Sequence, residues 1–129
     1  MKLNGKKILL TDDEPNILRV VTARLVSQGY QVMTAADGEE ALAKARSEKP
    51  DLMLLDVLLP HIDGYKVCET IKGDSDLGHI PVILFSAKTQ TIDRQRGKEA
   101  GADAYIAKPF QPDQLLETIK NLLKGSRHG

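Results

Sequence analysis

The sequence is poor in the side chains that support several common functions. It contains one cysteine, Cys68, no tryptophan, three tyrosines and two phenylalanines. A single cysteine excludes an internal disulfide and fits a reducing cytoplasm, where we expect the protein to act. So few aromatic rings leave little surface for stacking on nucleic-acid bases. No apolar run approaches the ~20 residues needed to cross a bilayer, so we expect no membrane contact.

An excess of charge of either sign is also missing. Lysine plus arginine number 18, as do aspartate plus glutamate, which gives a formal net charge of +0. Nucleic-acid-binding domains usually carry a basic excess, so we expect no direct nucleic-acid contact. The 129 residues, with 41% hydrophobic and 28% charged side chains, are typical of one globular domain.

Five short apolar segments predict strands, at Lys6–Thr11, Gln31–Ala35, Asp51–Asp56, Pro81–Ser86 and Asp103–Lys108. Between and after them, apolar residues at helical spacing, proline starts and polar segments predict five helices, around residues 15–28, 37–45, 65–72, 89–100 and 112–123. Two strands, DLMLLD and PVILFS, are apolar on both faces, which is typical of a parallel sheet covered by helices on both sides. The sequence therefore predicts an α/β fold, a doubly wound five-stranded parallel sheet with five helices. We expect one domain over residues 1–124 and a linker stub or tail over residues 125–129.

Polar side chains stand at the ends of four predicted strands. They are Asp12 and Asp13 after the first, Asp56 at the end of the third, Ser86 at the end of the fourth and Lys108 at the end of the fifth. The carboxyl ends of parallel strands meet at one edge of the sheet, where open α/β folds bind their ligands. We therefore expect these five residues to converge on one site.

The chemistry of this set points to phosphoryl transfer. At an effective dielectric constant near 20, two like charges ~4 Å apart cost about 4 kcal/mol, so three carboxylates need a cation among them or a proton on one of them. Oxygen ligands in small number favour Mg²⁺ over Ca²⁺. One ammonium group, from Lys108, and one hydroxyl, from Ser86, complete a site complementary to a phosphoryl group. Asp56 is the best candidate for a nucleophile that forms an aspartyl phosphate.

Each of these residues alone has an ordinary structural interpretation. Asp13 could cap the first helix, Asp56 could begin a loop, and Ser86 could hydrogen-bond to the backbone. The three histidines lack the spacing of metal ligands. Only the joint placement at four strand ends indicates chemistry.

Four segments together resemble the signatures of the response regulator receiver domain, the CheY-like family. They are TDDEP, LLDVLLPHIDG, ILFSAK and AYIAKPF, in the right order and at the right spacing. The resemblance covers about Lys6 to Lys124. It implies the flavodoxin-like strand order 2-1-3-4-5.

The resemblance also implies roles for single residues. Asp56 matches the phosphorylation site, and Lys108 matches the invariant lysine that assists phosphoryl transfer. Asp12, Asp13 and Asp56 match the Mg²⁺ ligands, together with the backbone carbonyl of Leu58.

Further matches concern the response to phosphorylation. Ser86 matches the switch hydroxyl, which also assists the transfer, and Tyr105 matches the aromatic switch residue. Lys108–Pro109 resembles the family's cis peptide.

The implied function is that of a two-component signalling receiver. A sensor histidine kinase or a histidine phosphotransfer protein would supply the phosphoryl group, and a downstream effector protein or a fused output domain would receive the signal. We expect no enzyme activity beyond self-catalysed phosphoryl acceptance and slow autodephosphorylation. We expect a monomer, or a weak dimer through the face formed by the segments 89–100, 103–108 and 112–123.

Three other classes fit the sequence less well. A non-phosphorylated interaction module on the same fold would lack one of the five site residues, and all are present. A Mg²⁺-dependent aspartyl-phosphate phosphatase would need a second acid two residues after the nucleophile, where Leu58 stands. A flavodoxin-like electron carrier would need a phosphate-binding loop after the first strand, where TDDEP carries three carboxylates.

Overall fold

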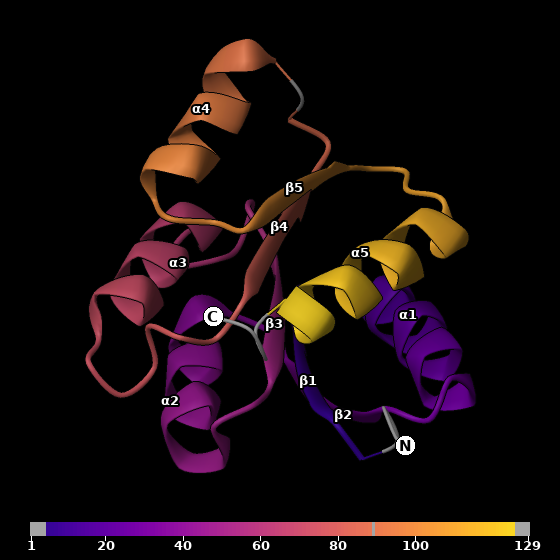
Figure 1. Cartoon of the computed structure of the whole chain (residues 1–129). Coiled ribbons are helices and arrows are strands. Elements are labelled where there is room, and N and C mark those ends of the chain that lie inside the picture. The colour runs from indigo at the N-terminus through magenta and orange to yellow at the C-terminus, as the bar shows by residue number, and fades with distance from the viewer. Residues whose placement is uncertain (1–4, 89, 126–129) are drawn as a thin grey trace.

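Strands and helices alternate along the chain in the computed structural model, which describes residues 5–88 and 90–125 (Figure 1). The strands are β1 (Lys7–Thr11), β2 (Gln31–Ala35), β3 (Leu52–Asp56), β4 (Val82–Ser86) and β5 (Ala104–Ala107). The helices are α1 (Pro15–Ser27), α2 (Gly38–Glu48), α3 (Gly64–Gly73), α4 (Thr91–Glu99) and α5 (Pro112–Gly125). All strand pairs are parallel, in the order β2-β1-β3-β4-β5. The predicted doubly wound sheet with five helices is therefore confirmed. Residues 1–4 and residues 126–129 of the predicted tail lie outside the described residues, and Gly125, predicted as the first residue of the tail, is the last residue of α5.

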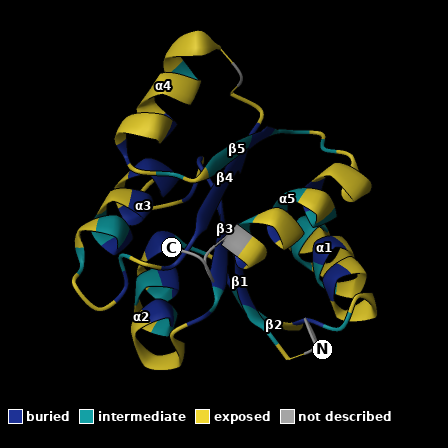
Figure 2. Ribbon diagram, viewed as in Figure 1, coloured by how far each residue is buried: buried dark blue, intermediate teal, exposed yellow. Residues whose placement is uncertain are grey.

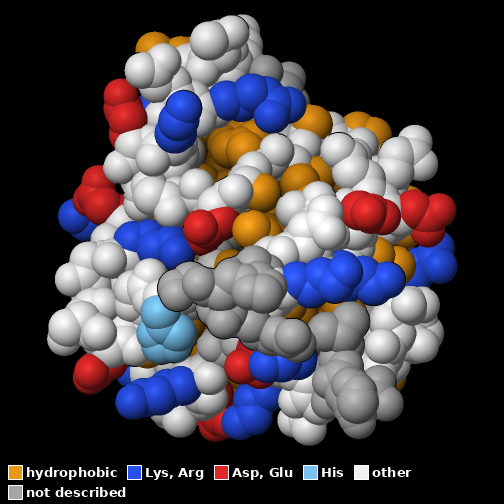
Figure 3. Space-filling model, in the orientation of Figure 1, with side chains coloured by type: hydrophobic (Ala, Val, Ile, Leu, Met, Phe, Trp, Pro, Cys, Tyr) orange, Lys and Arg blue, Asp and Glu red, His pale blue; other side chains and the backbone are white. Residues whose placement is uncertain are grey.

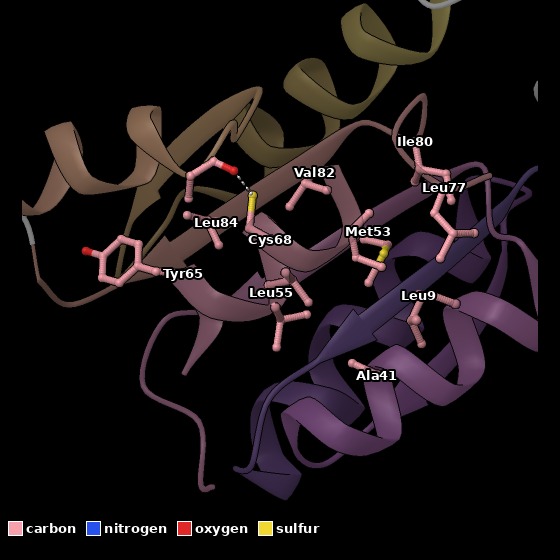
Figure 4. Close-up of a cluster of buried hydrophobic side chains, with 14 of the residues drawn as sticks. Leu9, Ala41, Met53, Leu55, Tyr65, Cys68, Leu77, Ile80, Val82 and Leu84 are labelled. Carbon is pink, nitrogen blue, oxygen red and sulfur yellow. Dashed lines mark hydrogen bonds between the residues drawn. The ribbon is translucent and has the colours of Figure 1, made fainter. Parts of the chain in front are cut away.

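Helices cover both faces of the sheet, with α2 and α3 on one side and α1 and α5 on the other (Figure 1). Successive strand residues point to opposite faces. Leu9 and Leu84 belong to the core cluster on the α2–α3 side (Figure 4), and Leu10 and Phe85 belong to the cluster on the α1–α5 side. Strands β3 and β4 are buried along their whole length (Figure 2), as their two apolar faces predict.

Two helices begin at aspartates that accept a backbone hydrogen bond. Asp37 accepts from the N–H of Glu40 at 2.8 Å, and the Glu40 carboxylate accepts from the N–H of Ala36 at 2.9 Å. Asp63 accepts from the N–H of Lys66 at 2.9 Å. These bonds satisfy N–H groups that have no partner inside their own helix, and they fix where α2 and α3 start.

The start of α3 also fixes the loop that follows β3. A Cβ atom at Gly64 would collide with the carbonyl oxygen of Asp56 and lie 2.8 Å from the Cα of Val57. The Gly64 N–H donates to the Val57 carbonyl at 2.9 Å. Only glycine permits this approach, so the loop between β3 and α3 folds back onto the strand end that carries Asp56.

One buried hydroxyl near this edge has no partner. Thr11, the last residue of β1, is fully buried, and its Oγ1 makes no hydrogen bond. In the described residues only Thr22 shares this property. A buried, unsatisfied hydroxyl costs about 1–3 kcal/mol, so β1 carries a local loss of stability one residue before Asp12.

We expect Thr11→Val to raise the free energy of unfolding by about 1 kcal/mol, because it removes the unsatisfied hydroxyl and keeps the side-chain shape. Thr11→Ala is the matched control, since it removes the same hydroxyl but also leaves a cavity and should not stabilise. Urea denaturation of the three proteins without divalent metal checks this. A valine variant less stable than the parent would show that the hydroxyl contributes a bond.

Candidate functional site

The five polar residues at the strand ends all lie at the carboxyl edge of the sheet. Asp12 directly follows β1, Asp56 ends β3, Ser86 ends β4 and Lys108 directly follows β5. One carboxylate oxygen from each of Asp12, Asp13 and Asp56 lies within 4.8 Å of the others. The Lys108 Nζ lies 2.9 Å from Asp12 Oδ2 and 3.2 Å from Asp56 Oδ2. Residues almost 100 positions apart thus meet in one charged cluster.

The two buried carboxylates are oriented by backbone groups two residues further along. Asp12 Oδ1 accepts a hydrogen bond from the N–H of Glu14 at 2.9 Å, and Asp56 Oδ1 accepts from the N–H of Leu58 at 3.2 Å. The other oxygen of each carboxylate faces Lys108. Each carboxylate therefore has a fixed orientation before any ligand enters.

The charges in this cluster are only partly balanced. Asp12 is fully buried and Asp56 is 4% exposed. Burial, and then the negative charge of Asp12, raise the pKa of Asp56 above its ordinary value, although Lys108 and the Leu58 N–H act in the opposite direction. Burial alone would lower the pKa of Lys108, but its bonds and charge contacts with Asp12 and Asp56 raise it. Lys108 therefore stays charged, but its one ammonium contacts only two of the three carboxylates in the cluster, an arrangement that can accommodate a further cation.

An aromatic pair places Lys108. Its Nζ lies 4.9 Å from the centroid of the Phe85 ring, and Phe85 packs edge-on against Phe110 with centroids 5.9 Å apart. The Lys108 N–H donates to the Ser86 carbonyl at 2.8 Å, and the Lys108–Pro109 peptide bond is cis. Sequence reasoning assigned no role at the site to Phe85, because a core residue of β4 carries no signal for the side chain that lies over it.

The two predicted switch residues contact the same backbone residue, Lys88. The Ser86 hydroxyl accepts from the Lys88 N–H at 3.0 Å, and the Tyr105 hydroxyl donates to the Lys88 carbonyl at 2.6 Å. Tyr105 also lies 3.3 Å from the hydroxyl oxygen of Tyr65. No sequence pattern indicated a role for the Lys88 backbone, because main-chain atoms carry no residue-specific signal. Tyr65 was likewise predicted only as the start of a helix.

Leu58 borders the site without closing it. Its N–H is bonded to Asp56, and its side chain is 54% exposed. The role of its carbonyl as a metal ligand stays a prediction.

This fold and site define a doubly wound α/β domain with an acidic cluster and a lysine at the carboxyl edge of its sheet. The family model for the response regulator receiver domain matches residues 8–120. The chain belongs to this family of two-component signalling domains.

Curated relatives are described as transcriptional regulators. The chain is 48% identical over 124 residues to the probable transcriptional regulator ycf27 of Cyanophora paradoxa, covering 96% of this chain and 51% of that protein. It is 44% identical over 122 residues to the alkaline phosphatase synthesis transcriptional regulatory protein PhoP of Bacillus subtilis (strain 168), covering 95% and 50%. The chain spans about half the length of the curated relatives it matches.

Solved structures share the whole architecture. A CheY-like receiver domain protein from Methanospirillum hungatei JF-1 superposes with a TM-score of 0.90 at 34% identity, covering 97% of this chain and 98% of that one. The receiver domain of a sensor histidine kinase from Pseudomonas aeruginosa PAO1 has a TM-score of 0.86 at 33% identity, covering 93% and 98%. That structure has a magnesium ion coordinated in its active-site cleft. In the described part of the present chain, no helix is long and apolar enough to cross a membrane.

We expect Lys108→Met to destabilise the metal-free protein increasingly as the pH rises. The raised pKa of Asp56 means that its ionisation opposes folding, and removing Lys108 raises that pKa further. The deficit relative to the parent should be smallest at acidic pH, should grow as the pH rises through the raised pKa of Asp56, and should reach about 3 kcal/mol near neutral pH.

Urea denaturation across this pH range measures the deficit. Lys120→Met on α5 is the matched control, since Lys120 is exposed and distant in sequence from the carboxylates. A deficit for Lys108→Met that does not change with pH would show that the lysine stabilises by packing and not by charge.

Proposed function

We propose that the domain accepts a phosphoryl group on Asp56 from the phosphohistidine of a sensor histidine kinase or a histidine phosphotransfer protein. The contact that carries the proposal is the 3.2 Å approach of Lys108 Nζ to Asp56 Oδ2, inside a cluster of three carboxylates. A purely structural ion pair would need one carboxylate, and the second and third add repulsion that is useful only when a ligand relieves it.

The chain's own residues perform the transfer by position and charge. A carboxylate oxygen of Asp56 forms the new O–P bond in line with the breaking N–P bond, and the histidine nitrogen leaves with the bonding electrons. Lys108 neutralises the phosphoryl oxygens, and Ser86 supplies a hydroxyl after it leaves the Lys88 N–H. The backbone bond from Leu58 keeps the Asp56 carboxylate oriented during the attack.

Mg²⁺ fits the acidic cluster. Asp12, Asp13 and Asp56 offer three oxygens within reach of one ion, and the Leu58 carbonyl is the further ligand that the family implies. When bound, Mg²⁺ neutralises charge that develops on the phosphoryl oxygens. The related Pseudomonas receiver domain, whose structure has a magnesium ion in its active-site cleft, supports this assignment.

The response to phosphorylation would be passed to an output domain or to another protein. The curated relatives are transcriptional regulators about twice as long as this chain. We infer a fused output domain or a separate effector protein that responds to the α4–β5–α5 face, where the domain stays monomeric or forms a weak dimer. In the cytoplasm, the receiver itself would make no contact with nucleic acid or membrane, and its own chemistry is limited to phosphoryl acceptance and slow autodephosphorylation.

Phosphorylation should occur at Asp56 alone. Incubation with a small-molecule phosphodonor and Mg²⁺, followed by borohydride trapping and peptide mapping, should give one modified aspartate. Asp56→Asn should abolish it, because the amide is not a nucleophile at neutral pH. Asp63→Asn is the matched control, since asparagine also caps a helix and Asp63 caps α3. Modification that persists in Asp56→Asn would refute the assignment.

Mg²⁺ should stabilise the folded protein through Asp13. At ~100 times its dissociation constant it should add about 2.7 kcal/mol to the free energy of unfolding. Asp13→Ala should lose this gain, and without metal it should be at least as stable as the parent, because one repelling carboxylate is gone.

Thermal unfolding with and without Mg²⁺ measures both effects. Asp76→Ala, an exposed aspartate in the loop between α3 and β4, is the control and should keep the full gain. An unchanged melting temperature of the parent in millimolar Mg²⁺ would exclude this metal site.

A further inference from the structure

Helix α4 has little apolar surface with which to pack. Among its residues only Gly97 is buried, and its one large hydrophobic side chain, Ile92, is exposed. A Cβ atom at Gly97 would lie 2.8 Å from the Cδ2 atom of Tyr105, so the helix backbone lies directly against that ring. Basic side chains lie over α4 in Figure 3. The position of α4 therefore depends on ring contacts and hydrogen bonds more than on an apolar face.

Two tyrosine hydroxyls supply these hydrogen bonds. Tyr65, in the first turn of α3, donates to the Asp93 carbonyl on α4 at 3.0 Å. Tyr105, on β5, donates to the Lys88 carbonyl at 2.6 Å, and the two hydroxyl oxygens lie 3.3 Å apart. Tyr65 lies at the edge of the core cluster with its hydroxyl pointing away from the aliphatic side chains (Figure 4). The two tyrosines thus connect α3 and β5 to the first turn of α4, through Asp93, and to the loop just before α4, through Lys88.

Both rings also face an arginine of α4. The Arg96 guanidinium carbon lies 4.4 Å from the centroid of the Tyr65 ring, and that of Arg94 lies 5.4 Å from the centroid of the Tyr105 ring. These distances are within the range of cation–π attraction. The ring of Tyr65 therefore contacts Arg96, while its hydroxyl bonds to the Asp93 carbonyl. Removing the hydroxyl alone separates the hydrogen bond from the ring contact.

The two hydroxyls have two protons for three contacts. When both donate to backbone carbonyls, none remains between the hydroxyl oxygens; when one donates to the other tyrosine, one carbonyl loses its donor. Burial, and then the bond with Tyr105, raise the pKa of Tyr65, so it keeps its proton at neutral pH. The contacts of Tyr65 and Tyr105 are consequently not independent.

We propose that Tyr65 is a positioning residue of the switch, whose hydroxyl holds α4 on α3 and favours, in the unphosphorylated domain, the position in which Tyr105 donates to the Lys88 carbonyl. This rests on the proposed function, because the displacement of Tyr105 follows phosphorylation of Asp56. When Ser86 turns toward the phosphoryl group it releases the Lys88 N–H, and when Tyr105 turns inward it releases both the Lys88 carbonyl and the Tyr65 hydroxyl. We expect this release to free the start of α4 and to break the Tyr65–Asp93 bond with it, so that the Tyr65 hydroxyl stabilises the unphosphorylated domain alone.

Tyr65→Phe tests the proposal. It removes the hydroxyl and leaves the ring beneath Arg96. Beryllofluoride with Mg²⁺ mimics the phosphoryl group on Asp56. In a titration with it, the concentration at half-saturation should be three- to tenfold lower than for the parent, roughly the effect of one hydrogen bond lost from the unphosphorylated state. Amide hydrogen exchange of the α4 residues in the metal-free protein should be faster by a similar factor, while α2 is unaffected. Tyr105→Phe combined with Tyr65→Phe should give less than the product of the single effects.

Tyr30→Phe is the matched control. Tyr30 and Tyr65 are each 6% exposed, but Tyr30 belongs to the core cluster on the α1–α5 side. Its variant should bind beryllofluoride as the parent does. If the parent responds and Tyr65→Phe has an unchanged midpoint, the role of Tyr65 is refuted and the proposed function stands. If the parent itself does not respond to beryllofluoride and Mg²⁺, the proposed function fails, and the role of Tyr65 in the switch fails with it.

Discussion

At the carboxyl edge of the sheet, carboxylates are held close enough together to repel one another. Asp12 and Asp56 are almost fully buried, and Lys108 is the cation that contacts both. A fold selected only for stability would replace such a cluster with apolar residues, which are often neutral or better. The cluster instead leaves the edge of the sheet deficient in positive charge. The backbone N–H groups of Glu14 and Leu58 hold the two carboxylates in a fixed geometry.

The sequence was sufficient to predict the architecture because each level of pattern agreed with the others. Apolar strands gave a covered parallel sheet, and topology placed Asp12, Asp56 and Lys108 at one edge, where the structure brings them together. The boundaries moved by one to three residues; for example, the strand expected at Asp103–Lys108 is Ala104–Ala107. That shift has a physical reason, since the Asp103 side chain accepts the Val82 N–H at 2.8 Å instead of extending the strand.

What the sequence could not predict are contacts that depend on tertiary packing of ordinary residues. Phe85 was recognised as a core strand residue, but nothing in the chain indicated that Lys108 would lie over its ring. The Lys88 backbone is the shared partner of Ser86 and Tyr105, and main-chain atoms carry no residue-specific signal. Nothing in the sequence indicated that the missing side chain of Gly64 allows the β3–α3 loop to approach Asp56.

The contacts of the proposed switch fall into two groups of different energy, the tyrosine hydroxyls beside α4 and the charged cluster around Asp56. Moving a two-state equilibrium from about 1:99 to 99:1 requires about 5.5 kcal/mol of differential binding. One neutral hydrogen bond contributes only about 0.5–1.5 kcal/mol, so the hydroxyls of Tyr65 and Tyr105 cannot supply that sum. The charged cluster around Asp56 can, because charge-assisted bonds are stronger and Asp56 and Asp12 lie where water screens them little. In the proposed switch, the carboxylates and Lys108 would therefore provide the driving force, and the tyrosine pair beside α4 would set the ratio of the two states before phosphorylation.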